Sequence, residues 1–339
     1  MRPSAAAVAS DTAAELTKHF EGLRDPSHYG PDACSRFADT IARIRELKTA
    51  RRAVILAHNY QRPEIFEVAD VVGDSLELAQ KARSVDADII VLCGVAFMAE
   101  TAKILNPSRR VLLPDRHAGC SLADSVTAEN LAKKKIELKA IYPDLKVVTY
   151  VNTSADVKAE SDVCCTSANA VKIVEKVDSD HILFVPDRNL ASHVQKNTSK
   201  TIISWDGDCY VHHQITPEQI RRVRDTVPGI QVIAHPECRE DVLRMADAVL
   251  STSGMIAFAR ESAAQKFLVV TECGLSDRLT LELPAKTFYK SCKLCMFMKM
   301  ITLEGTLRSL ETLEYEITLD ESVRLRAERA LQRMFELGA

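Results

Sequence analysis

Four sequence patterns recur three times along this chain, and their spacing constrains the fold more than any other feature. The first pattern is an apolar run, rich in β-branched residues, that ends in polar residues. Such a run is typical of a buried strand with functional side chains at its carboxyl end. The three copies are residues 53–60 (AVILAHNY), 146–152 (KVVTYVN) and 231–238 (QVIAHPEC).

Three further patterns follow each of these strands in the same order. One has an aspartate, a short apolar stretch and a Ser or Thr that opens a helix, and its copies are 69–79, 161–171 and 246–259. The next is another apolar strand, at 88–94, 181–187 and 266–274. The last ends in a cysteine, and its copies are 110–120, 201–209 and 287–295.

The spacing of single residues within these patterns is regular. Asp70, Asp162 and Asp247 are separated by 92 and 85 residues, and the cysteines that end the fourth pattern are separated by 89 and 86. A period held by four separate features predicts three copies of one α/β unit. Helical stretches such as 97–105 place apolar residues at i, i+3 and i+4, as helices that cover a sheet do.

We therefore expect an α/β fold of three homologous three-layer αβα domains with parallel sheets, arranged with pseudo-three-fold symmetry around a central active site. The expected segments are an N-terminal extension over 1–40, repeats over 41–120, 121–209 and 210–297, and a C-terminal helical segment over 298–339 that packs on the first repeat.

Composition excludes several classes of protein. The formal net charge of −3 argues against a chain that coats nucleic acid. No apolar run approaches the length of a membrane span, and acidic residues early in the chain argue against a secretory or transit peptide. We expect a cytoplasmic protein. In that reducing compartment its ten cysteines should not form a disulfide framework.

Cys120, Cys209 and Cys295 occupy the equivalent place in each repeat. Three thiolates on a common axis would suit a [4Fe–4S] cluster with one iron left open as a Lewis acid. The alternative is a buried cysteine that the repeats share for packing. Cys292 and Cys295 also form a C-x-x-C pair, which is weak evidence for zinc because no second pair lies nearby. The remaining cysteines are interpreted as structural.

Polar residues at the strand ends are candidates for catalysis and binding. His and Glu are common general acid–base residues, and one of the two histidines that closely follow Cys209 should face the same cavity. Hydroxyls that precede the helical patterns are either ordinary N-caps or, beside helix N-termini, ligands of a small polyanionic substrate. The strand-end candidates are His58, Tyr60, Tyr150, Asn152, His235 and Glu237, and the hydroxyl candidates are Ser75, Ser167, Thr252 and Ser253.

These stretches together resemble the quinolinate synthase family of NAD biosynthesis. The matching segments include AHNYQRPEI, VADVVGDSLELA, RHAGCSLADS, VVTYVNTSADV, WDGDCYVHHQI, HPEC and STSGMI, and they extend from about residue 50 to 310. The resemblance implies three similar α/β domains around one site and an oxygen-sensitive [4Fe–4S] cluster. It also implies a transferase that condenses iminoaspartate with dihydroxyacetone phosphate to quinolinate, releasing phosphate and two waters, and a functional link to an enzyme that supplies iminoaspartate.

By motif position, the resemblance assigns the cluster ligands to Cys120, Cys209 and Cys295. It assigns substrate binding to His58, Tyr60, Ser75, Tyr150, Asn152, Ser167, His212, His235, Glu237, Ser251 and Thr252. Tyr60, Tyr150, His235 and Glu237 are the expected acid–base residues. One departure concerns the last ligand, because Met296 stands where the family usually has Pro. The choice of Cys295 over Cys292 depends on Met298 and Lys299, which follow it.

Two other functions compete with this one. A redox or iron-sensing protein could keep the cluster without catalysis, and a metal-dependent aldolase or lyase could use a similar cavity. The polar strand ends favour an enzyme, because a sensor does not need three matched sets of them.

Overall fold

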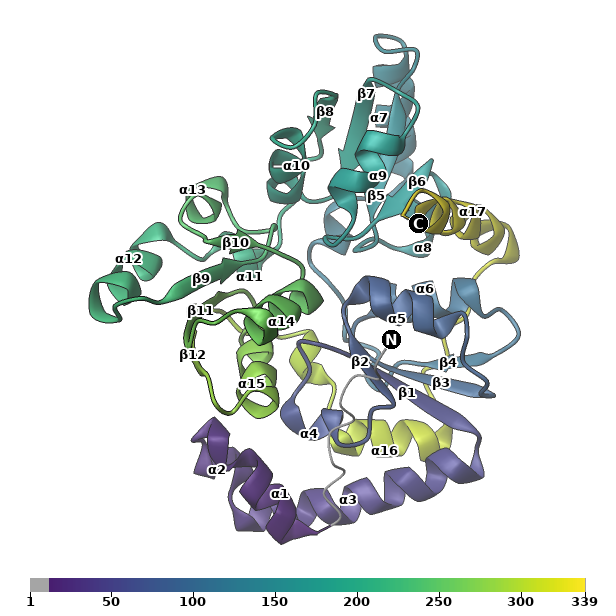
Figure 1. The fold of residues 1–339 in the computed structure, drawn as a ribbon. Coiled ribbons are helices and arrows are strands. Elements are labelled where there is room, and N and C mark those ends of the chain that lie inside the picture. Colours follow the sequence, from purple (N-terminus) through teal and green to yellow (C-terminus); the bar gives the residue numbers. More distant parts are fainter. Residues whose placement is uncertain (1–11, 339) are drawn as a thin grey trace.

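The computed structural model describes residues 12–338 and contains three α/β units, each built on a four-stranded parallel sheet (Figure 1). The strand order β2-β1-β3-β4 of the first sheet recurs as β6-β5-β7-β8 and as β10-β9-β11-β12. Every pairing within the three sheets is parallel. The predicted α/β fold with three parallel sheets is confirmed.

The first unit is built around its buried central strands. Its central strands are buried on both faces, which explains why their sequences are uninterrupted apolar runs. The strands are β1 (Ala53–His58), β2 (Val71–Gly73), β3 (Ile89–Cys93) and β4 (Arg110–Leu112), and the helices are α4 (Pro63–Phe66), α5 (Ser75–Ala82) and α6 (Ala96–Leu105). The helix expected over 97–105 is therefore present as α6.

The second and third units repeat this plan. The second unit contains η2 (Ala123–Ser125), α7 (Ala128–Lys139), β5 (Lys146–Tyr150), α8 (Ala155–Ala159), β6 (Val163–Cys165), α9 (Ala170–Lys176), β7 (His181–Val185), α10 (Arg188–Gln195) and β8 (Thr201–Ser204). The third contains α11 (Tyr210–His213), α12 (Pro217–Thr226), β9 (Gln231–Ala234), α13 (Glu240–Leu243), β10 (Ala248–Val249), α14 (Thr252–Glu261), β11 (Lys266–Val270), α15 (Cys273–Glu282), β12 (Thr287–Lys290) and η3 (Met298–Met300).

The repeated aspartates join the first two strands of each unit at the amino-terminal end of the second strand. Each carboxylate accepts the N–H of a residue in the first strand, and the aspartate's own N–H donates to the carbonyl of that same residue. The three carboxylate bonds are Asp70 to Ile55 at 2.7 Å, Asp162 to Val147 at 2.8 Å and Asp247 to Val232 at 2.7 Å. This reciprocal pairing accounts for the aspartate that marks the sequence repeat.

The N-terminal segment does not separate from the first unit where we expected. Its elements are α1 (Ala13–Phe20), η1 (Glu21–Leu23), α2 (Pro26–Tyr29) and α3 (Pro31–Ala50). Helix α3 is continuous through the expected boundary after residue 40, so one helix joins the end of the extension to the start of the first repeat. Residues 1–11 of the expected extension lie outside the described residues.

The C-terminal segment divides between two units. Helix α16 (Leu303–Thr312) packs against α3 and β3, as expected for a segment on the first repeat. Helix α17 (Glu321–Gly338) packs mainly against α8, β6 and α9 of the second unit, which corrects the expectation (Figure 1). Its buried apolar side chains recur at i, i+3, i+4 and i+7, and they are Ala327, Ala330, Leu331 and Met334. An ion pair at 2.6 Å joins Arg326 to Glu160 of the second unit.

One disulfide is present, contrary to expectation. It joins Cys273 at the start of α15 to Cys292 beyond β12, with the two Cα atoms 5.1 Å apart. The two segments that carry these cysteines come this close because the parallel pairing of β11 with β12 continues into a bridge between Glu272 and Lys293. Five other cysteines are buried packing residues: Cys34, Cys93, Cys164, Cys165 and Cys238.

Candidate functional site

The carboxyl ends of β1, β5 and β9 meet at one cavity with about 650 Å³ of empty volume. In parallel α/β units, ligands bind beyond the carboxyl ends of the strands, so the cavity lies where this topology puts a site. Its walls include the six polar residues predicted at the strand ends, which are His58, Tyr60, Tyr150, Asn152, His235 and Glu237.

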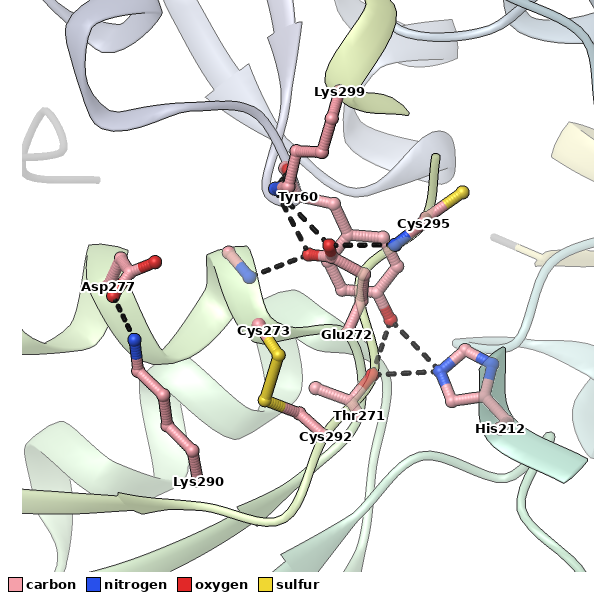
Figure 2. The surroundings of a disulfide bond; sticks show 11 residues. Tyr60, His212, Thr271, Glu272, Cys273, Asp277, Lys290, Cys292, Cys295 and Lys299 are labelled. Carbon is pink, nitrogen blue, oxygen red and sulfur yellow. Dashed lines mark hydrogen bonds and ion pairs between the residues drawn. A yellow bond between two sulfur atoms is a disulfide. The ribbon is translucent and has the colours of Figure 1, made fainter. Parts of the chain in front are cut away.

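A buried set of polar contacts connects the first and third units across this cavity. The Tyr60 hydroxyl lies 2.5 Å from Oγ1 of Thr271, which in turn lies 2.9 Å from Nε2 of His212 (Figure 2). The other ring nitrogen of His212, Nδ1, lies 2.6 Å from Oε2 of Glu237. All four side chains are buried, so water does not compete strongly for these contacts.

The second unit joins the same network through Ser167, which contacts His235 of the third unit. His235 lies between Glu237 and this serine. Its Nδ1 lies 3.6 Å from Oε2 of Glu237, and its Nε2 lies 3.2 Å from the hydroxyl of Ser167. The His235 ring stacks on His212 with centroids 4.7 Å apart. Polar side chains of all three units thus form one continuous set of contacts.

Burial sets the protonation of these groups. It lowers the pKa of both His58 and His235 to about 3, so both imidazoles are neutral near neutral pH. Burial raises the pKa values of Tyr60 and Tyr150 well above the ordinary value, and Glu237 raises them further. Burial alone would also raise the pKa of Glu237, but the contact with His212 outweighs it and lowers that pKa to about 2.

Ser75 and Thr252, two of the hydroxyl candidates at helix starts, are not the caps of their helices. Asp74 caps α5 with bonds of 3.0 Å from the N–H groups of Leu76 and Glu77, so Ser75 is the first helical residue. Both Ser75 and Thr252 line the cavity, at the start of α5 and α14 respectively. Since neighbouring residues provide the caps, the alternative that these two hydroxyls act as N-caps is excluded.

Ser251 and Ser167 differ from those two. Ser251 is the cap of α14: its Oγ accepts the N–H of Gly254 at 3.2 Å and donates to Asp74 at 3.0 Å. It does not contribute to the cavity wall described here. Ser167 does line the cavity, and Asn169 rather than Ser167 is at the cap position of α9.

Three cysteines also line the cavity, one following the last strand of each unit. They are Cys120, Cys209 and Cys295, and all three are free thiols. Burial raises the pKa of the Cys120 thiol to about 12, and it raises the pKa values of the Cys209 and Cys295 thiols too. Without a bound cation these groups are therefore protonated. Cys292 is engaged in the disulfide, so of the C-x-x-C pair only Cys295 is available as a ligand.

Other donors lie close to one of these cysteines. The ligand atoms of Cys209, His212 and Glu237 lie within 4.8 Å of one another. Asn152 contributes a buried Oδ1 with no hydrogen-bond partner among residues 12–338. The cavity thus combines thiols, an imidazole, a carboxylate and an unsatisfied amide oxygen, which is a donor set suited to a metal centre and a polar ligand.

Comparison with known proteins identifies a matching family. Residues 42–336 match the family described as quinolinate synthetase A protein. The chain is 50% identical to quinolinate synthase 1 of Methanosarcina acetivorans over 299 residues, covering 88% of this chain and 97% of that protein. It is 48% identical to the quinolinate synthase of Sinorhizobium fredii over 302 residues (89% and 83%), and 49% identical to that of Xylella fastidiosa strain 9a5c over 303 residues (89% and 88%).

The chain belongs to the quinolinate synthase family. It is accordingly an enzyme of NAD biosynthesis, and the family assignment made from the sequence motifs is confirmed. None of the helices in residues 12–338 combines the length and apolar composition that crossing a bilayer requires.

Sequence reasoning missed two residues at this site, one in the cavity wall and one behind it. Thr271 joins Tyr60 to His212, and Glu272 lines the wall beside Cys295. Both follow the third strand of the third unit, where the second unit has Pro186 and Asp187. Alignment of the third strands of the repeats would have drawn attention to this acidic position.

Proposed function

We propose that this quinolinate synthase condenses iminoaspartate with dihydroxyacetone phosphate to form quinolinate, phosphate and two waters, and that Cys120, Cys209 and Cys295 hold a [4Fe–4S] cluster with one open iron. The observation that carries the proposal is that one free cysteine from each unit lines the same cavity as Glu237 and the two buried tyrosines. A packing role alone does not explain why all three cysteines border a polar cavity.

The residues present fit such a cluster. Iron–sulfur clusters are held by cysteine thiolates, and three ligands leave one iron free for another donor. When bound, the cluster supplies a Lewis acid that polarises oxygen groups of the substrate and helps hydroxide to leave. Asn152, whose Oδ1 is unsatisfied within the described residues, is available to bind the substrate beside it.

The proposed proton transfers use groups whose protonation states are set by burial and by neighbouring side chains. Condensation, isomerisation, dehydration and ring closure all move protons between carbon, nitrogen and oxygen. Glu237 is ionised and can accept a proton, while Tyr60 and Tyr150 are protonated and can donate one. The neutral His235 lies between Glu237 and Ser167, and it completes the proposed acid–base set.

Two helix starts supply the proposed anion sites. Iminoaspartate carries two carboxylates and dihydroxyacetone phosphate carries a phosphate. Asp74 and Ser251 already accept N–H groups in the first turns of α5 and α14, but the positive dipole end of each helix still attracts such anions. Ser75 and Thr252 add hydroxyls at these two points of the cavity wall. His58, His212 and Ser167 complete the proposed binding set.

The proposal also covers the enzyme's surroundings. It includes a cytoplasmic location and a supply of iminoaspartate from a separate enzyme. The net charge of −3 supports small-molecule substrates over a nucleic acid partner.

Anaerobic reconstitution followed by an assay with both substrates tests the function directly. We expect about four iron and four sulfide per chain, together with quinolinate formation. Cys120→Ala, Cys209→Ala and Cys295→Ala should each lose the cluster and the activity, whereas Cys164→Ala should keep both because Cys164 is buried in β6. Loss of the cluster in Cys292→Ala with retention in Cys295→Ala would contradict the ligand assignment.

Glu237→Gln tests the acid–base role. The amide keeps the shape of the side chain but cannot accept a proton, and general acid–base catalysis contributes about 10²–10⁴-fold. We expect turnover to fall by at least that factor while iron content and product binding stay at wild-type levels. A variant with near-normal turnover would remove Glu237 from the mechanism.

Ser75→Ala and Thr252→Ala test the anion sites, with Ser251→Ala as the matched cap control. A lost hydrogen bond to a charged ligand costs about 1.5–3 kcal/mol, so the KM for an anionic substrate should rise roughly 10- to 150-fold. The Ser251 variant should instead lose about 0.5–2 kcal/mol of stability, as loss of a helix cap does, with little change in KM. The anion-site proposal fails if all three variants melt earlier and bind substrate normally.

A further inference from the structure

Two buried carboxylates occupy matching places in the second and third units. Asp187 follows β7 by two residues, and Glu272 follows β11 by two residues. Each caps the next helix: Asp187 Oδ1 accepts the N–H of Leu190 at 2.7 Å, and Glu272 Oε2 accepts that of Gly274 at 2.6 Å. Both residues have no exposed surface. Burial of a carboxylate is costly, so this arrangement calls for an explanation beyond helix capping.

The second oxygen of each carboxylate binds the backbone of a cysteine that lines the cavity. The N–H of Cys209 donates to Asp187 Oδ2 at 3.2 Å, and the N–H of Cys295 donates to Glu272 Oε1 at 3.1 Å (Figure 2). Each carboxylate therefore joins the rigid start of a helix to the loop that carries a thiol. The same geometry occurs twice, at chain separations of 22 and 23 residues.

The first unit uses its backbone instead. The cap position of α6 is occupied by Val95, whose side chain has no hydrogen-bonding group. Here the N–H of Ala96 donates to the carbonyl of Ala118 at 2.7 Å, which holds the loop two residues before Cys120. All three cysteine loops are thus fixed to the helix that follows the third strand, but only two of them through a carboxylate.

We propose that Asp187 and Glu272 are positioning residues that hold the backbones of Cys209 and Cys295 where their sulfur atoms can bind the cluster. This inference rests on the cluster of the proposed function. Groups that orient metal ligands typically change metal affinity by about 10- to 100-fold when they are removed. Lys299, whose Nζ lies 3.2 Å from Glu272 Oε1, balances the charge of one of the two carboxylates.

The test uses Asp187→Asn and Glu272→Gln in the full-length, anaerobically reconstituted enzyme. Each amide keeps one oxygen, so only one of the two N–H groups keeps its acceptor. In the Asn and Gln variants the remaining oxygen can turn toward the cysteine N–H and keep that bond. Asp187→Ala and Glu272→Ala remove both acceptors and so exclude this outcome. The readout is the rate at which an iron chelator bleaches the cluster absorption, alongside the melting temperature of the apo-protein.

Asp162→Asn and Asp247→Asn are the matched controls in the same two units. Their carboxylates also accept a backbone N–H, but at the amino-terminal end of the second strand. We expect the alanine variants to release iron about 10- to 100-fold faster than wild type, whereas the controls release it at the wild-type rate even if they melt earlier. The positioning role is overturned if the alanine variants release iron at the wild-type rate, or if the controls accelerate release equally. A wild-type enzyme that binds no cluster would overturn the proposed function itself.

Discussion

Parallel strand pairing in a fixed order is the constraint on which the site depends. In each unit the first strand lies between the second and the third, so its carboxyl end opens at the point where neighbouring connections diverge. Three units with this same order bring His58, Tyr150 and His235 to one cavity. At the amino-terminal end of the second strand, Asp70 and its two counterparts fix its pairing with the first strand through reciprocal hydrogen bonds.

Burial gives the cavity its chemistry. Taking an ionised carboxylate out of water is unfavourable unless a partner compensates, and Glu237 has Nδ1 of His212 at 2.6 Å. The same burial keeps His58 and His235 neutral and the tyrosines protonated. Donors and acceptors of protons therefore coexist within a few ångströms without neutralising one another, as stepwise condensation and dehydration require.

The sequence predicted what repeats or alternates along the chain. The three strand runs, the repeated aspartates and the three cysteines all came from periodicity, and the structure has strands at the predicted apolar runs. The path of α17 to the second unit was not predictable, because an amphipathic helix does not encode which partner it covers. The Cys273–Cys292 disulfide depends on strand register that no local pattern reveals. Asp187 was missed because an aspartate before a helix resembles an ordinary cap, and Glu272 because only an alignment of the third strands pairs it with Asp187.

The central claim is that three units jointly hold one cluster whose open iron faces the substrate. Mössbauer spectroscopy of protein reconstituted with isotopically enriched iron, recorded with and without quinolinate, tests it most directly. With three protein ligands, the account predicts that about one iron in four changes its spectrum when quinolinate binds, while the other three stay as they were. A spectrum without a four-iron cluster, or one in which quinolinate leaves every iron unchanged, would contradict the account.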